Sequence, residues 1–147
     1  MMWQLKKFQQ LELEELYQIL KNRVDIFVVE QECAYPEIDG IDPKCYHLFK
    51  KDQAEIVAYA RLVPKGILYD QPAIGRIIVN QAYRKHGYGR ELIDQAINII
   101  TEDWSEAEIK LQGQTYLREF YQSFGFKEIS EPYLEDGIPH VDMIYKK

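Results

Sequence analysis

The sequence predicts a single α/β (α+β) domain over residues 1–147, with a mixed central sheet of six to seven strands and helices on both faces. Short alternating or continuous apolar runs indicate strands, and apolar residues at three- and four-residue spacing indicate helices. Some strands are joined by hairpin-length connections and others through helices, which requires a sheet with both antiparallel and parallel pairs.

The first half of the chain contains one helix and three strands. We expect a first strand over residues 3–8, and residues 46–50 and 55–63 form a hairpin. Directly before this hairpin, residues 29–45 show no apolar periodicity and carry many carboxylates, which predicts an acidic loop. The helix before that loop is indicated by apolar residues at helical spacing, namely Leu13, Leu16, Tyr17, Leu20, Val24, Phe27 and Val28.

A strand, a turn and a helix follow. Residues 73–79 form an apolar, β-branched run, which predicts a buried strand, and residues 80–86 are polar. The helix after this turn is indicated by Leu92, Ile93, Ala96, Ile97, Ile99 and Ile100.

The last third of the chain adds three strands and a short helix. A strand begins at residues 109–111, and residues 115–124 read as a helix that ends at Gly125. The last two strands are expected over residues 126–129 and 141–145.

Composition and charge exclude several classes of protein. A net charge of -6 and a pI near 5.1 argue against general binding to nucleic acid or to an anionic membrane, because both require a basic face. We find no signal peptide and no apolar run of about 20 residues, so we expect a cytoplasmic protein. Cys33 and Cys45 lack C-x-x-C spacing and clustered histidines, which predicts two reduced thiols and no metal site.

The turn before the second long helix has the features of a phosphate-binding site. Backbone N–H groups at a helix start are unpaired and can bind an anion. Gly87 and Gly89 let the main chain approach a bulky phosphate, and neighbouring side chains add positive charge. We therefore expect a pyrophosphate to be bound by Arg84, Lys85, His86, Gly87, Tyr88, Gly89 and Arg90.

Two ordered motifs resemble those of a known superfamily. Val79, Arg84, Gly87 and Gly89 are similar to the V-x-x-x-x-Q/R-x-x-G-x-G/A signature of the GNAT superfamily of acyl-CoA-dependent N-acetyltransferases. Residues 120–126 resemble its F-Y-x-x-x-G-F element. The sequence resembles the bacterial ElaA-type branch of this superfamily over nearly the whole chain, including residues 28–33, 38–40, 59–61 and 135–140.

The resemblance implies a function and a cofactor site. It implies transfer of an acetyl group from acetyl-CoA to a primary amine by direct attack, with no covalent enzyme intermediate and no metal. Ile77, Ile78 and Val79 would line the pantetheine arm through main-chain groups, and residues 84–90 would surround the pyrophosphate. The strand carrying Ile77 would be bulged and splayed from the next strand, so that the cofactor occupies the gap.

Tyr121 occupies the position that resembles the family's general acid, where a phenol would protonate the departing thiolate. The alternative is a core aromatic on a helix face shared with Tyr116, Leu117, Phe120 and Phe124. The general base stays unassigned, because Arg76 stands on a strand where better-known members of the family place a Glu. The candidates are an ordered water, Glu30, His47 and His140.

The acceptor that the resemblance implies is an amine of a small molecule or a peptide. Two loops carry carboxylates that either line an acceptor mouth or form a solvated acidic surface, namely Glu30, Glu32, Glu37, Asp39, Glu135 and Asp136. A polyamine, an amino sugar and a protein lysine would each suit such a mouth. The alternative function is a non-catalytic module that binds CoA or a protein partner, and the sequence leaves open whether the chain forms a homodimer.

Overall fold

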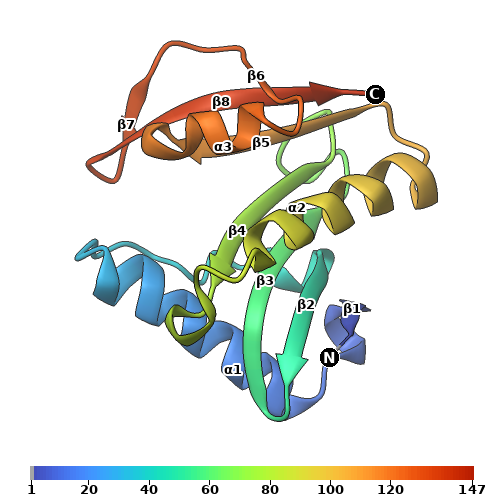
Figure 1. The fold of residues 1–147 in the computed structure, drawn as a ribbon, viewed down its shortest axis with the longest axis vertical. Coiled ribbons are helices and arrows are strands. Elements are labelled where there is room, and N and C mark those ends of the chain that lie inside the picture. Colours follow the sequence, from blue (N-terminus) through green and yellow to red (C-terminus); the bar gives the residue numbers. More distant parts are fainter. Residues whose placement is uncertain (1) are drawn as a thin grey trace.

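The computed structural model describes residues 2–147 and has one sheet with helices on both sides (Figure 1). Within these described residues three α-helices and eight strands follow one another. In order they are β1 (Trp3–Lys7), α1 (Leu13–Val24), β2 (Tyr46–Asp52), β3 (Glu55–Val63), β4 (Ala73–Val79), α2 (Tyr88–Asn98), β5 (Glu108–Gln114), α3 (Arg118–Gln122), β6 (Lys127–Glu128), β7 (Tyr133–Glu135) and β8 (Ile138–Lys146).

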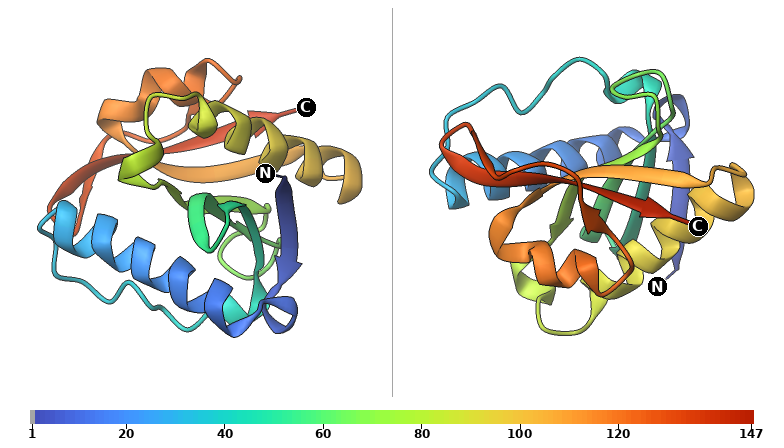
Figure 2. Two further views of the ribbon diagram at one scale, coloured as in Figure 1. Left: turned by 60° about the horizontal axis from the view of Figure 1, so that its bottom comes forward. Right: turned by 90° about the horizontal axis from the view of Figure 1, so that it is seen from above.

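The strands form a mixed sheet, as the connection lengths predict. Its order is β1-β2-β3-β4-β5-β8-β6, with β7 paired to β8. β4 and β5 pair in parallel, and the other strand pairs are antiparallel. In Figure 2, α1 covers one face of the sheet and α2 and α3 cover the other.

The sheet has more strands than the six to seven expected, because β7 was not predicted. In addition, β8 begins before residue 141. A sequence signal for this hairpin was present: Asp136 and Gly137 link the two strands with φ values of +51° and +79°. Asp-Gly is the dipeptide that such a two-residue turn favours, since both of its positions need positive φ.

Both long helices continue beyond their α-helical part as π-helical turns. The turn Asp25–Glu30 extends α1, and Ile99–Asp103 extends α2. The helical path of α1 therefore reaches Glu30, slightly beyond the residue at which we expected the acidic loop to begin. This extension carries the Glu30 carboxylate across the sheet toward the turn before α2.

Each face of the sheet has its own apolar core. On one side Leu92, Ile93 and Ala96 of α2 are buried in a large cluster with strand residues, and Tyr121 of α3 belongs to the same cluster. On the other side Ile19 of α1 is buried in a smaller cluster. Full burial of a Leu or Ile side chain contributes roughly 1.5–3 kcal/mol to the stability of the fold, so these buried residues hold the helices to the sheet.

The centre of the sheet is splayed, as the resemblance implied. β4 and β5 pair in register only at Ala73 and Lys110 within residues 2–147, close to the start of each strand. The register of β4 against β3 shifts between Gly75 and Ile78, and Arg76 in this bulge has φ of +49°. An extra residue in one strand bends it. The bulge therefore turns β4 away from β5 toward their carboxyl ends.

Candidate functional site

The opening between β4 and β5 leads into a cavity of about 830 Å³, within the usual size range of small-molecule sites. Its walls come from the end of α1, from β3, β4 and β5, from α3 and from the β7–β8 hairpin. The cavity brings together many of the residues singled out from the sequence, namely Glu30, Ile77, Ile78, Val79, Arg84, Gly89, Tyr121 and His140.

The turn at one end of this cavity presents the start of α2. Gly87 has φ of +81° and is followed by the first helical residue, and no side chain in the described chain caps this helix. A Cβ on Gly87 would meet no atom of residues 2–147 within 4 Å. The N–H groups of the first turn are thus accessible and carry the positive end of the helix dipole. Such a helix start can bind a phosphate.

The two arginines of this turn are already held by protein groups. Arg84 donates from Nε to the Val79 carbonyl and from Nη2 to Glu30, both at 3.1 Å. The Arg90 guanidinium lies 4.4 Å from the centre of the Phe124 ring, a cation–π contact with a residue just after α3. Both side chains therefore have a fixed position beside the helix start, with Arg84 on the cavity wall.

Of the remaining residues of the turn, Gly89 lines the cavity and Lys85, His86, Gly87 and Tyr88 do not. Lys85 and His86 are exposed, and the Tyr88 ring packs under the Lys50 ammonium at 5.0 Å. A Cβ on Gly89 would lie 3.7 Å from Val79, which is an ordinary contact. The backbone conformation therefore requires glycine at position 87 more strictly than at position 89.

Tyr121 is part of the cavity wall and only 5% exposed. Its ring packs flat against Gly113 of β5, where a Cβ would lie 3.1 Å from Cε2. Glycine at that position therefore leaves the space that the ring occupies. Burial raises the pKa of the Tyr121 phenol well above its ordinary value, so the hydroxyl stays protonated at neutral pH.

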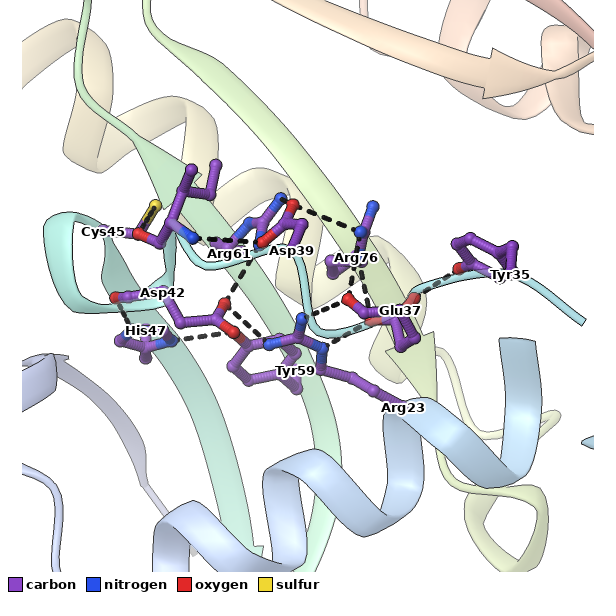
Figure 3. Close-up of polar contacts among 11 residues, drawn as sticks. Arg23, Tyr35, Glu37, Asp39, Asp42, Cys45, His47, Tyr59, Arg61 and Arg76 are labelled. Carbon is purple, nitrogen blue, oxygen red and sulfur yellow. Dashed lines mark hydrogen bonds and ion pairs between the residues drawn. The ribbon is translucent and has the colours of Figure 1, made fainter. Parts of the chain in front are cut away.

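The acidic loop is largely a buried ionic network rather than a solvated surface (Figure 3). Glu37 and Asp42 are both buried, and Arg23 of α1 reaches them with N–O distances of 2.7 Å and 2.8 Å. Arg61 of β3 also contacts Asp42, at 3.0 Å. Sequence reasoning missed all three partners of these carboxylates, because Arg23, Arg61 and Arg76 stand on three different elements.

The part of this network that reaches the cavity consists of Asp39, Arg61 and Arg76. Arg61 binds Asp39 at 2.9 Å, and Arg76 binds Glu37 at 2.8 Å and Asp39 at 3.3 Å. Burial would raise the pKa of the Asp39 carboxyl, but the hydrogen bond and charge of Arg61 outweigh it and hold this pKa below its ordinary value. Asp39 is therefore ionised at neutral pH.

The two acidic loops do converge on one mouth. Glu30, Asp39, Glu135 and Asp136 all line the cavity, whereas Glu32 and Glu37 do not. The Cys33 thiol donates a hydrogen bond to the Asp136 carbonyl at 3.3 Å and so joins the loop after α1 to the β7–β8 hairpin. Both cysteines are free thiols, as expected.

The two histidine candidates have different surroundings. His47 is 1% exposed and lies outside the cavity lining, with Nδ1 2.7 Å from the Tyr59 hydroxyl and Nε2 3.0 Å from the Asp42 carbonyl. Burial also lowers its pKa. The expectation that His47 contributes to the site is therefore wrong, because its ring is enclosed and both nitrogens have internal partners. His140 lines the cavity, and its Nδ1 lies 2.7 Å from the Ile138 carbonyl.

A family model described as an acetyltransferase (GNAT) domain matches residues 9–147. The chain belongs to the GNAT family. Protein ElaA of Escherichia coli is 38% identical over 143 residues, which cover 96% of this chain and 94% of ElaA. A UPF0039 protein of Schizosaccharomyces pombe is 46% identical over 140 residues, covering 94% of this chain and 92% of that protein. This GNAT chain is thus ElaA-like.

A solved structure has the same fold over its whole length. The crystal structure of an acyl-CoA N-acyltransferase from Pseudomonas aeruginosa superposes with a TM-score of 0.93 at 35% identity, covering 99% of each chain. Acyl transfer from an acyl-CoA is the general chemistry of the GNAT family. The splayed gap, the uncapped start of α2 and the open space around Gly87 fit a long co-substrate with a phosphate-rich end.

Two further features are absent from residues 2–147 of this GNAT domain. No helix there has both the length and the apolar character needed to cross a membrane. No cluster of three or more His, Cys, Asp or Glu side chains in the same residues is arranged to hold a metal ion.

Proposed function

We propose that the protein transfers the acetyl group of acetyl-CoA to a primary amine by direct attack on the thioester. One observation carries the proposal: a single cavity joins the uncapped start of α2, the splayed edge of β4 and the buried Tyr121. A long thioester entering along β4 would then have its phosphates at one end of this path and Tyr121 beside the other end.

The main chain of β4 supplies the binding surface for the pantetheine arm. Ile77, Ile78 and Val79 lie beyond the point where β4 pairs with β5, so peptide groups on that edge have no strand partner in the described residues. Unpaired strand edges bind extended ligands through main-chain hydrogen bonds. The N–H groups near Ile78 and Val79 are also our candidates for stabilising the oxyanion of the tetrahedral intermediate.

The turn 84–90 holds the pyrophosphate in this proposal. The helix start attracts its charge, Gly87 permits close approach, and Arg84 adds a guanidinium at the cavity wall. Lys85, His86, Tyr88, Gly89 and Arg90 complete the turn.

Tyr121 donates a proton to the thiolate that leaves when the thioester breaks. Its raised pKa keeps the proton on the phenol until a stronger base appears beside it. A thiolate that forms in a buried site is such a base, because it has lost its hydration.

The acceptor is a cationic amine. Arg61 and Arg76 are balanced by the carboxylates they bind, and Arg84 by Glu30. Glu135 and Asp136 remain exposed at the mouth and give it a negative field that attracts ammonium groups. A polyamine, an amino sugar and a peptide lysine all satisfy this condition.

The test combines binding and turnover. Acetyl-CoA at 100 times its dissociation constant should stabilise the protein by about 2.7 kcal/mol, which a thermal shift measures. Release of free CoA thiol is then followed with spermidine, glucosamine and a lysine-containing peptide as acceptors. Stabilisation without acetylation of any of the three would favour the non-catalytic CoA-binding module, and no stabilisation would refute both functions.

A further inference from the structure

We propose that His140 is the general base of this site and removes the proton of the attacking amine through Nε2. This assignment rests on the proposed acetyl transfer. It names the general base, for which β4 offers no carboxylate. Arg76 occupies the bulge of β4 and already binds two carboxylates, so this cationic side chain cannot accept a proton.

The other candidate bases are occupied. Glu30 binds Arg84 at 3.1 Å, and Asp39 binds Arg61 at 2.9 Å. Each of these two carboxylates already accepts from a guanidinium, and taking up a proton would break that ion pair. His47 is enclosed by protein, as described above. Among the candidates, His140 is the titratable side chain on the cavity wall whose contacts leave a basic atom free to act.

The contact of Nδ1 determines which nitrogen of His140 is basic. The carbonyl oxygen of Ile138, 2.7 Å away, can only accept a hydrogen bond, so the neutral ring must carry its proton on Nδ1. Nε2 then holds the lone pair. The ring also stacks on Tyr133 with a centroid distance of 6.4 Å, which limits its rotation. Both contacts come from the β7–β8 hairpin itself.

The direction of the His140 side chain follows from its strand position. Val141 is buried in the same cluster as Tyr121, on the face covered by α2 and α3. Adjacent residues of a strand point to opposite faces, so His140 faces the side covered by α1. Gln114, its register partner on β5, confirms this by bonding Gln31 at the end of the helical path of α1.

The base and the acid therefore approach the splayed sheet from opposite faces. His140 lines the cavity together with Glu135 and Asp136 of its own hairpin, while Tyr121 stands on the α3 side. In the reaction the acceptor ammonium first releases one proton to solvent. The neutral amine nitrogen then forms a C–N bond with the thioester carbon, and Nε2 takes one of its remaining N–H protons. The C–S bond then breaks, its electron pair stays on sulphur, and sulphur receives the Tyr121 proton. Exchange with water returns His140 and Tyr121 to their starting states.

Several charged and titratable groups surround this histidine. Glu135 and Asp136 lie on its own hairpin and line the same cavity, Tyr133 stacks on its ring, and Asp142 accepts a hydrogen bond from Tyr133. Glu30 faces the same cavity from the end of α1.

The experiment compares His140→Gln with the wild type, using as acceptor whichever of spermidine, glucosamine or the lysine peptide the wild type acetylates. We expect kcat to fall by about 10²–10⁴-fold, the usual contribution of a general base. The thermal shift with acetyl-CoA should be unchanged, which also verifies folding. Leu134→Ala, a substitution of a 71% exposed side chain on the same hairpin, is the matched control and should keep its activity.

A second variant and a spectrum make the result decisive. Added imidazole should restore part of the activity of His140→Ala, whereas it would not rescue a structural defect. Ring ¹⁵N–¹H correlation spectra of the wild type should show the Nδ1–H tautomer at His140. An active His140→Gln variant or an Nε2–H tautomer would overturn the base assignment alone. A wild type that acetylates no amine would overturn the acetyl-transfer proposal itself.

Discussion

Glu37 and Arg76 form an ion pair of 2.8 Å across the bulge of β4, and the same carboxylate oxygen accepts from Arg23 of α1 at 2.7 Å. One loop carboxylate therefore joins a helix to the strand that borders the cavity. This relationship explains how a bulged strand with a positive-φ arginine is held in place, since Arg76 also donates to the Glu37 carbonyl.

Glu37→Gln should destabilise the protein strongly. The substitution removes the charge that two guanidinium groups share in a buried place, and breaking a buried pair in this way costs roughly 3 kcal/mol or more. Urea unfolding would show a lower midpoint with an unchanged slope. Glu32→Gln, at an exposed position of the same loop, should leave the free energy of unfolding within about 0.5 kcal/mol of the wild type.

Gly87→Asp should abolish the thermal shift caused by acetyl-CoA. It places a side chain where φ is +81° and adds a negative charge at the helix start. Gly66→Asp is the matched control, because Gly66 has φ of +87° and equally open surroundings within the described chain but lies in another loop. If both variants keep the shift, the phosphates do not bind at the start of α2.

Tyr121→Phe should lower kcat on the order of 10²-fold while acetyl-CoA binding persists, because the ring is kept and the proton donor is lost. Steady-state release of CoA thiol measures the effect. Tyr17→Phe changes a tyrosine that is 67% exposed on α1 and should have no effect. Equal turnover of Tyr121→Phe and wild type would assign Tyr121 to the core alone.

The stability of the protein should decrease in acid partly through Glu15. Burial would raise the pKa of this carboxyl, but hydrogen bonds from Lys51 and Lys6 outweigh it and lower the pKa from 4.5 to about 2. Because the folded pKa is the lower one, this stabilisation is complete above about pH 4.5 and disappears as pH falls toward 2. Unfolding midpoints measured across that window should fall less with decreasing pH in Glu15→Gln than in the wild type. The exposed Glu14→Gln should show the same pH dependence as the wild type.

Much of the fold could be predicted because its signals are local. Apolar spacing within a few residues located both long helices and most strands, and Gly87 marked the start of α2. The β7–β8 hairpin was missed although Asp136 and Gly137 carried its signal, because β7 is only three residues long and mostly exposed.

The surroundings of individual polar residues could not be predicted in this way. Glu32 and Glu37 lie in the same loop and look alike in sequence, yet one is exposed and the other is buried. His47 and His140 are likewise the same residue type, and only their distant neighbours separate a buried histidine from one on the cavity wall.

The sequence by itself determined the family, most of the order of the elements and the position of the glycine-containing turn before α2, because each depends on residues close together along the chain. Tertiary structure alone decided which carboxylates are paired and which histidine reaches the cavity. Pairing and burial depend on partners that folding brings from distant elements, as Arg23, Arg61 and Arg76 are brought to one loop. Their energies therefore have no signature in the local sequence.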